Sequence, residues 1–243
     1  IGFIPDDCLH YLPFAAMNYR GRYLTEGFSI FYLPSASWLE QSAAGKPRPG
    51  RRILAFGDPD LQDETLDLHH AAEELKRIRK QGDMVLLNKQ ASEMRAADPL
   101  SDFDVLHFAV RGQFTAADPL SSGLLLTPGG GRDGTLTALE IFRLQYQGRT
   151  VVLSGCETAP DKDPEARSFT VLQRAFLHAG TSSVVPSLWL VGDRASSYLL
   201  EIFYRQFERN KTAAEALRTA QLRLIREGYP PHVWAAFIVT GKY

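Results

Sequence analysis

TVVLSGCET, residues 150–158, is the stretch that decides the fold expected of this chain. Val151–Leu153, followed by Ser154, are typical of a short buried strand that enters a turn. The strand ends at Gly155, so Cys156 follows at its carboxyl end, where open parallel sheets build their sites. A cysteine placed after a turn-forming glycine is a candidate nucleophile. The alternative is a small buried hydrophobic residue that ends a strand.

On both sides of this stretch, apolar strand patterns alternate with amphipathic helix patterns. The expected strands are residues 53–57, 84–87, 104–110, 124–126, 151–154, 183–191 and 234–239, and the expected helices are residues 67–80, 91–97, 137–145, 168–179, 194–209 and 212–226. This alternation begins near Arg52 and favours a mostly parallel α/β sheet with helices on its faces. Pro186 removes a backbone donor, so its strand is expected to be bulged or near a sheet edge.

Residues 1–50 are expected to form a strand-rich segment that precedes a core of residues 51–243. The segment is rich in aromatic and turn residues, and short strands are predicted at Leu9–Leu12 and Phe28–Leu33. It ends in GKPRPG, Gly45–Gly50, a polar connector. The segment either adds strands to the core sheet or forms the edge of a second, non-catalytic lobe. Because the chain begins with isoleucine rather than methionine, we expect a fragment of a longer protein.

The composition excludes several classes of function. The net charge is -1 and the pI is near 6.7, so no strong basic field exists to hold nucleic acid or an anionic membrane. No apolar run approaches the ~20 residues of a spanning helix, so no membrane partner is expected. Two cysteines, Cys8 and Cys156, form neither a disulfide framework nor a zinc site, which favours a reducing, cytoplasmic setting.

The histidines indicate no metal site. His69 and His70 precede Glu73 and Glu74, and this cluster is interpreted as the solvated start of a helix. No other histidine has a cysteine or carboxylate at a ligand spacing. We therefore expect neither a metal nor a cofactor.

Two motifs at predicted strand ends carry a resemblance to a known family. They are LHFAVRG, Leu106–Gly112, and LSGCET, Leu153–Thr158. Both resemble the catalytic motifs of the CHAT domain family of caspase-like cysteine peptidases, in the clan of the caspases, separase and gingipains. Further matches follow in the same order at residues 4–14, 32–37, 174–180, 184–193 and 234–237. The resemblance implies a caspase-like α/β fold and an endopeptidase that acts on a protein without a cofactor.

The resemblance also implies roles for single residues. Cys156 matches the nucleophile, and the backbone N–H groups of Gly112 and Cys156 match the donors to the oxyanion. The family's base is the histidine directly before the motif glycine, and here that residue is Arg111. An arginine guanidinium stays protonated and cannot accept a proton, so the base is lost. His107, which matches a structural residue of the family, shares the face of Arg111 but lies roughly 13 Å away along an extended chain, too far for a base.

Three interpretations remain open from the sequence. The chain is an endopeptidase domain whose activity is impaired because Arg111 replaces the base, either by engineering or in this copy. Alternatively, it is a natural pseudo-protease, a signalling scaffold that binds a peptide or partner without cutting it. A third possibility is a structural signalling module attached to upstream repeats, because domains of this family are often joined to tetratricopeptide repeats. The expected partners are a protein or peptide substrate, an upstream repeat region and an activating protein.

The substrate is expected to bind in extended form beside the sheet, through main-chain pairing. Related caspase-like families often prefer a basic side chain before the cut, which an acidic pocket holds. The candidates for that pocket are Asp193, Glu157 and Asp161. The alternative for Asp193 is that it caps the helix expected at residues 194–209.

Overall fold

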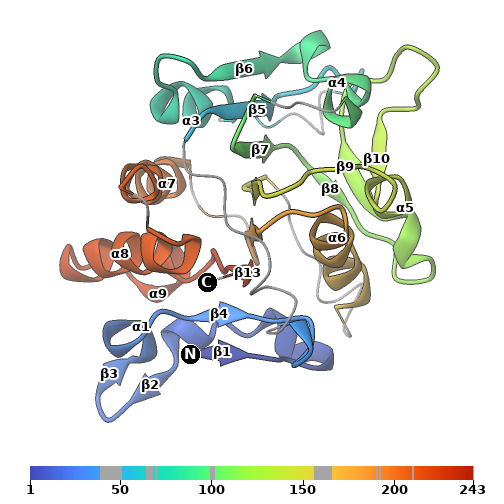
Figure 1. Cartoon of the computed structure of the whole chain (residues 1–243). Coiled ribbons are helices and arrows are strands. Elements are labelled where there is room, and N and C mark those ends of the chain that lie inside the picture. The colour runs from blue at the N-terminus through green and yellow to red at the C-terminus, as the bar shows by residue number, and fades with distance from the viewer. Residues whose placement is uncertain are drawn as a thin grey trace.

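An eight-stranded sheet forms the centre of the molecule, in the order β1-β4-β13-β12-β11-β7-β5-β6 (Figure 1). The structure is a computed structural model that describes residues 1–38, 51–63, 68, 71–98, 102–155, 166–189, 191, 193–209 and 211–242. The strands of the sheet are β1 (Gly2–Phe3), β4 (Phe31–Tyr32), β13 (Thr240–Gly241), β12 (Ser183–Pro186), β11 (Thr150–Leu153), β7 (Val105–Ala109), β5 (Ile53–Gly57) and β6 (Met84–Leu87).

Five neighbouring strands, from β6 to β12, run parallel to one another. β13 is antiparallel to β12, and β4 and β1 follow the direction of β13. The carboxyl ends of the five parallel strands therefore meet at one edge of the sheet. This arrangement confirms the predicted mostly parallel α/β fold.

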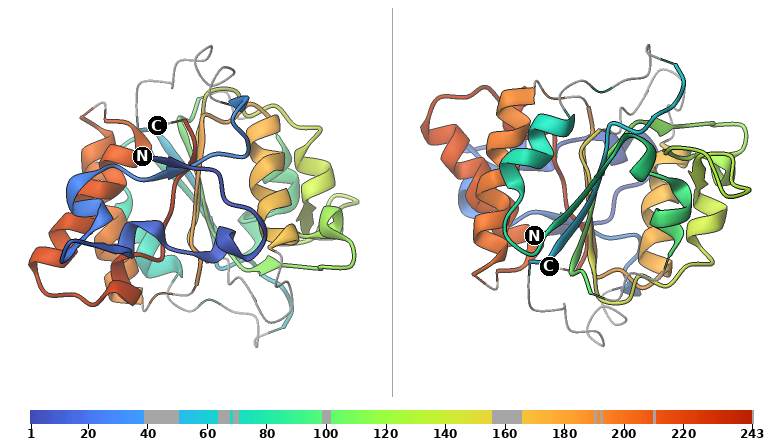
Figure 2. Two further views of the ribbon diagram at one scale, coloured as in Figure 1. Left: turned by 90° about the horizontal axis from the view of Figure 1, so that it is seen from below. Right: turned by 90° about the horizontal axis from the view of Figure 1, so that it is seen from above.

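Helices cover both faces of the sheet (Figure 2). One face packs against α3 (Ala71–Ile78), α7 (Asp193–Phe207) and α8 (Ala213–Arg226), and the other against α4 (Glu93–Ala97), α5 (Ala138–Ile141) and α6 (Arg167–His178). Side chains alternate between the faces along each strand. On β7, Val105 therefore joins the core under α3 and α7, while Leu106 joins the core under α6. No helix in the described part of the chain is long and apolar enough to cross a membrane.

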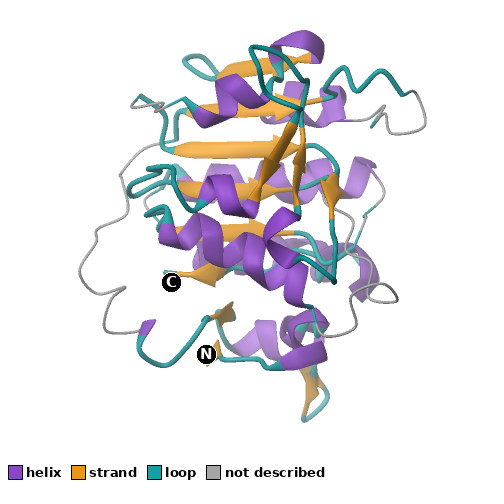
Figure 3. Ribbon diagram, turned by 90° about the vertical axis from the view of Figure 1, so that its right-hand side faces the viewer, coloured by secondary structure: helices purple, strands orange, loops and turns teal. Residues whose placement is uncertain are grey.

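A second, small sheet continues from the carboxyl end of β7 and lies beside α5 (Figure 1), and its strands run across those of the central sheet (Figure 3). It is antiparallel and consists of β8 (Gly112–Gln113), β9 (Gly123–Leu125) and β10 (Thr135–Thr137). The 3₁₀ helix η5 (Pro119–Ser121) lies between β8 and β9 in the sequence, and η4 (Asn88–Gln90) precedes α4. The small sheet fixes the backbone that follows β7, which is where one of the two motifs ends.

The N-terminal segment adds strands β1 and β4 to the central sheet through β13. Between these strands lie the 3₁₀ helices η1 (Asp7–Tyr11) and η2 (Phe14–Ala16), the hairpin β2 (Asn18–Tyr19) and β3 (Arg22–Tyr23), and α1 (Leu24–Gly27). α1 is joined to α8 by a hydrogen bond of 2.8 Å from Thr25 Oγ1 to Gln221 Oε1. The connector Gly45–Gly50 lies outside the described residues, so the domain boundary at residue 50 stays a prediction.

Two predicted strands are wrong. Leu9–Leu12 belongs mostly to η1, because the turn at Asp6 directs its carbonyl to the N–H of Leu9 at 3.2 Å. The strand predicted at residues 234–239 begins only at Thr240, and Trp234 is instead the last residue of α9 (Pro231–Trp234). Ile238 N donates a hydrogen bond to Pro186 O at 3.2 Å. Pro186 has no N–H to donate in return, so the hydrogen-bond ladder between the two segments is interrupted at this pair.

The position of Pro186 also differs from the prediction. β12 lies between β11 and β13 rather than near an edge, and the register of Ser183 with Gly241 continues to Ser187 with Phe237 without a bulge. Pro186 is the last residue of the strand, where the missing donor shortens the pairing with β13 without removing β12 from the sheet.

Candidate functional site

The two motifs end on neighbouring strands. β7 and β11 are parallel partners, with Phe108 opposite Leu153, and the N–H of Ser154 donates to the carbonyl of Phe108 at 3.0 Å. The chain therefore leaves both strands at the same edge of the sheet. This is the arrangement expected of a site built at the carboxyl ends of parallel strands.

Gly155 packs directly against the chain that leaves β7. A Cβ atom added to Gly155 would lie 2.7 Å from the carbonyl oxygen of Val110 and 2.8 Å from its nitrogen. Backbone atoms at this distance cannot move aside as the end of a flexible side chain does. The position therefore requires glycine, and the close contact joins the residue before Cys156 to the residue before Arg111.

Arg111 and Gly112 are held by the small sheet. The N–H of Leu125 donates to the carbonyl of Arg111 at 2.9 Å, and Gly112 is the first residue of β8, opposite Leu124. Arg111 is half-buried. The backbone of Arg111 and Gly112 is therefore held by pairing with β9, and it is joined through Val110 to the end of β7.

The remaining predicted site residues are less fully described. Cys156, Glu157 and Asp161 lie outside the described residues. Asp193 is the first residue of α7, which begins after β12 at the same edge of the sheet. The structure brings the end of β11 together with Val110–Gly112, whereas the roles assigned to these residues stay predictions.

A buried polar cluster lies beneath this edge, and it is not among the sites predicted from the sequence. Its centre is the carboxylate of Glu74 on α3, which is 7 % exposed. Oε1 accepts hydrogen bonds from Ser154 Oγ at 2.5 Å and from His107 Nε2 at 3.1 Å. Oε2 accepts a hydrogen bond from Ser196 Oγ of α7 at 2.9 Å. The cluster therefore joins α3, β7, the end of β11 and the first turn of α7.

His107 uses both ring nitrogens inside this cluster. Nε2 faces Glu74 and lies 2.9 Å from Ser154 Oγ, so Nε2 carries the hydrogen. Nδ1 lies 2.8 Å from the hydroxyl of Tyr204. Burial, and then the charge of Glu74, raise the pKa of Tyr204 well above its usual value, so its hydroxyl keeps the proton. That hydroxyl can donate to Nδ1 or accept from it, which satisfies the ring in either protonation state.

The cluster contains a serine, a histidine and a carboxylate, yet its geometry differs from that of a hydrolytic triad. In a triad the carboxylate and the hydroxyl contact opposite nitrogens of the imidazole. Here Glu74 and Ser154 share Nε2, and Tyr204 occupies Nδ1. His107 is also fully buried. The ring has no access to a substrate, which agrees with the structural role that the resemblance implies for it.

A pattern in the sequence could have identified this cluster. The buried positions of α3 are Ala71, Glu74, Leu75 and Ile78, which are spaced as one face of a helix. Glu74 therefore lies on the apolar stripe rather than in the solvated helix start that the sequence suggested. On the strands, His107 is opposite Val152, and Ser154 projects from the same face two residues later.

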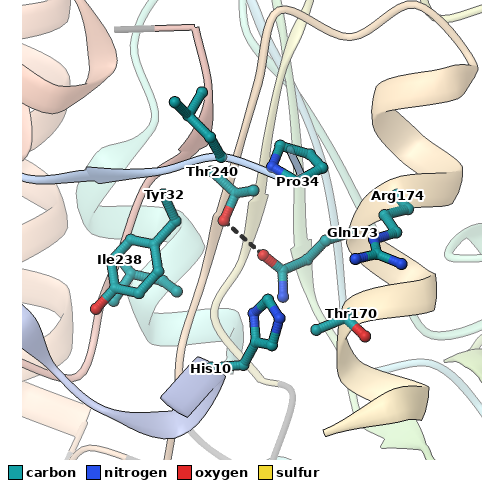
Figure 4. A pocket seen from close by; sticks show the side chains of 9 residues that line it. His10, Tyr32, Pro34, Thr170, Gln173, Arg174, Ile238 and Thr240 are labelled. Atoms are coloured by element: carbon teal, nitrogen blue, oxygen red, sulfur yellow. Dashed lines mark hydrogen bonds between the residues drawn. The ribbon is translucent and has the colours of Figure 1, made fainter. Parts of the chain in front are cut away.

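A separate pocket lies between η1, β4 and α6 and has a volume of about 10 Å³, room for about one water molecule. Its lining residues are His10, Tyr32, Leu33, Pro34, Thr170, Gln173, Arg174, Ile238 and Thr240 (Figure 4). Thr240 Oγ1 donates to Gln173 Oε1 at 2.6 Å. Burial and the charge of Arg174 lower the pKa of His10. The lining contains neither cysteine nor serine, and the described residues hold no group of metal-ligating side chains.

Known proteins are similar to this chain in sequence or in fold. The family model of the CHAT domain matches residues 1–242. Tetratricopeptide repeat protein 28 of Homo sapiens is 24% identical over 96% of this chain, and the protein of that name from Mus musculus is 23% identical over 96%. The chain spans 12% of the length of each of these relatives.

Two solved structures share the fold. Separase in the Saccharomyces cerevisiae separase–securin complex has a TM-score of 0.59 at 13% identity, over 96% of this chain and 14% of that one. The Arg-specific cysteine proteinase gingipain R has a TM-score of 0.53 at 11% identity, over 88% of this chain and 53% of that one. These likenesses confirm the caspase-like fold, and the match over residues 1–242 shows that the chain belongs to the CHAT domain family.

Proposed function

We propose that this chain is a caspase-like cysteine endopeptidase domain in which Cys156 is the nucleophile and Arg111, at the position of the base, impairs hydrolysis. The observation that supports it most directly is the contact between Gly155 and Val110, whose next residues are Cys156 and Arg111. A nucleophile and its activating group must lie within hydrogen-bond reach in a productive complex.

The reaction needs a thiolate, an oxyanion site and a source of protons. The thiolate sulfur bonds to the scissile carbonyl carbon, the C–N bond breaks, the amine takes a proton, and water then hydrolyses the thioester. The N–H groups of Gly112 and Cys156 stabilise the oxyanion in this proposal. Arg111 supplies positive charge that favours the thiolate, but it does not readily give its proton to a leaving amine. Acylation is the impaired step.

A peptide with a basic side chain before the cut is the proposed substrate. Gingipain R, which shares the fold, is named as Arg-specific. Asp193, Glu157 and Asp161 are the acidic residues assigned to the pocket, and Asp193 follows β12 at the edge where β7 and β11 end. Main-chain pairing along the sheet would hold the rest of the peptide.

The partners follow from the relatives. Tetratricopeptide repeats occur in the name of the curated relatives, and separase was solved together with securin. An upstream repeat region and an activating protein are therefore the proposed protein partners. A thiol nucleophile must stay reduced, so the cytoplasm is the proposed compartment.

The second candidate function is that of a pseudo-protease, a signalling scaffold that binds a peptide or partner without cutting it. Arg111 itself favours this candidate, because a permanent cation at the base position cannot accept the proton that cleavage requires a base to take up.

Cleavage of a mixed peptide library by three forms separates the two functions. The forms are the chain itself, Arg111→His, and Arg111→His combined with Cys156→Ala. Restored cleavage that depends on Cys156 supports an impaired enzyme, and the expected gain is ~10²–10⁴-fold, the usual effect of a positioned acid–base group. Absence of cleavage by a folded Arg111→His form, with its activator present, supports the pseudo-protease.

A further inference from the structure

Glu74 lies at the junction of the two chain segments that border the candidate site. Ser154, which is two residues before Cys156, and Ser196, three residues after Asp193, donate to the two oxygens of one carboxylate. β11 and α7 are distant from each other in the sequence. One buried side chain therefore connects the end of β11 to the first turn of α7.

The cost of burying this carboxylate is large unless it is fully hydrogen-bonded. Three donors, two hydroxyls and the Nε2–H of His107, satisfy it. A hydrophobic residue at this position of α3 would pack the same face without such a requirement. The use of a carboxylate here indicates that β7, the end of β11 and α7 must be held in defined relative positions, which stability alone would not require.

We propose that Glu74 is a positioning residue for the candidate cysteine site, holding the carboxyl end of β11 and the first turn of α7 in a fixed relative position through Ser154 and Ser196. The proposal rests on the proposed function in assigning Cys156 as the nucleophile. Glu74 touches neither substrate nor thiol in it, and acts through the backbone on either side of the site.

The test is the rate of Cys156 alkylation by iodoacetamide as a function of pH, in a Cys8→Ser background because Cys8 is an exposed free thiol. The variants are Glu74→Gln and Ser154→Ala. We expect alkylation at about pH 6 to slow roughly tenfold, with the pH profile displaced by about one unit toward that of a free thiol. Ser154→Thr keeps the hydroxyl and is expected to restore the rate.

The direction of the change separates positioning from simple electrostatics. Removing the negative charge of Glu74 would by itself favour the thiolate and speed alkylation. A slower reaction in Glu74→Gln therefore reports lost positioning, and Ser154→Ala tests the same link with the charge of Glu74 retained. Faster alkylation in Glu74→Gln, or an unchanged profile in Ser154→Ala, would overturn the proposal.

Two control variants match the burial and chemistry of the tested residues. Glu93→Gln alters a carboxylate that is 1 % exposed and bound to Arg132, on the opposite face of the sheet. Ser183→Ala alters a buried hydroxyl bonded to Thr150 at the opposite edge. Both are expected to lower the melting temperature and leave the alkylation profile unchanged. An equal displacement of the profile in the controls would show a general loss of stability and contradict a specific role for Glu74.

Hydrogen exchange provides a readout independent of the thiol. Glu74→Gln is expected to raise exchange at residues 151–155 and at 194–200 together, whereas Glu93→Gln leaves both unchanged. Exchange that rises in neither segment would also overturn the proposal. The proposed function is tested by a different experiment, in which it fails if the Arg111→His form does not cleave peptides. The alkylation and exchange measurements do not depend on the outcome of that cleavage assay.

Discussion

Nε2 of His107 lies 3.1 Å from Oε1 of Glu74, and this contact joins the first turn of α3 to the middle of the central sheet. Burial alone would raise the pKa of the Glu74 carboxyl. Hydrogen bonds from His107, Ser154 and Ser196, with the charge of His107, outweigh burial and lower the pKa below its usual value. The carboxylate is therefore ionised in the folded protein.

The first prediction concerns acid stability. Because the folded pKa of Glu74 is lower than the unfolded one, its ionisation stabilises the fold above the ordinary carboxyl pKa of 4.5 and stops doing so as the pH falls through the folded value. The groups that face it are His107, Tyr204 and, across the Tyr204 ring, Arg51. As the pH falls below 4.5, the melting temperature of the parent chain is expected to fall more steeply than that of Glu74→Gln.

Thermal unfolding followed by circular dichroism at a series of pH values checks this prediction. Glu215→Gln serves as the control, since Glu215 is an exposed carboxylate in the capping box of α8. Parallel curves for the parent and Glu74→Gln would show that Glu74 makes no pH-dependent contribution to stability.

The second prediction concerns Gly155. Gly155→Ala places a Cβ atom within 2.7 Å of the backbone of Val110, so the ends of β7 and β11 must separate. We expect a loss of ~1–3 kcal/mol in the free energy of unfolding, the usual cost of overpacking. The matched control is Gly27→Ala, because no atom lies within 4 Å of the added Cβ there. Denaturant unfolding measures both, and equal stability of the two variants would contradict the close contact.

The fold could be predicted because the strands and helices of the core carry strong periodic signals. The pattern of the expected helix at residues 168–179 corresponds to α6, and that of residues 212–226 to α8. The N-terminal segment could not be predicted in the same way. Its strands β1 and β4 have only two residues each. β4 is positioned by pairing with β13, which is distant in the sequence, and β1 by pairing with β4.

The candidate site was only partly predictable for a similar reason. The motifs indicate which strand ends carry chemistry, and the structure has these strands side by side. The partners of Glu74 come from β7, β11 and α7, and their meeting depends on strand register and helix packing. Local propensity contains no information on such contacts, so a solvated helix start was the natural interpretation of Glu74.

The third prediction concerns Asp193. Asp193 is the first residue of α7, so two roles compete for it: a place in the acidic pocket, or stabilisation of the start of this helix. A role in the acidic pocket predicts that Asp193→Asn weakens binding of an arginine-containing peptide while leaving the melting temperature unchanged. Peptide titration and thermal unfolding of the same samples check this. A lower melting temperature with unchanged peptide binding would assign Asp193 to the helix end alone.

The fourth prediction concerns the effect of Arg111 on the thiol. If Arg111 lies beside Cys156, as the contact between Val110 and Gly155 supports, its charge favours the thiolate. In the Cys8→Ser background, Cys156 is expected to react with iodoacetamide at about pH 7 faster than a free cysteine in a peptide. Arg111→Gln removes the charge and should slow alkylation roughly tenfold, which is the effect of one pKa unit on the thiolate fraction.

Arg111→Lys is the matched variant, since it keeps the charge and loses only the planar fork of donors. It is expected to alkylate within a few-fold of the parent, because a single positive charge is what favours the thiolate. If Arg111→Gln and Arg111→Lys slow the reaction equally, hydrogen-bond geometry rather than charge activates the thiol. If neither changes the rate, Arg111 is remote from Cys156, and the proposed pairing of nucleophile and base position is wrong.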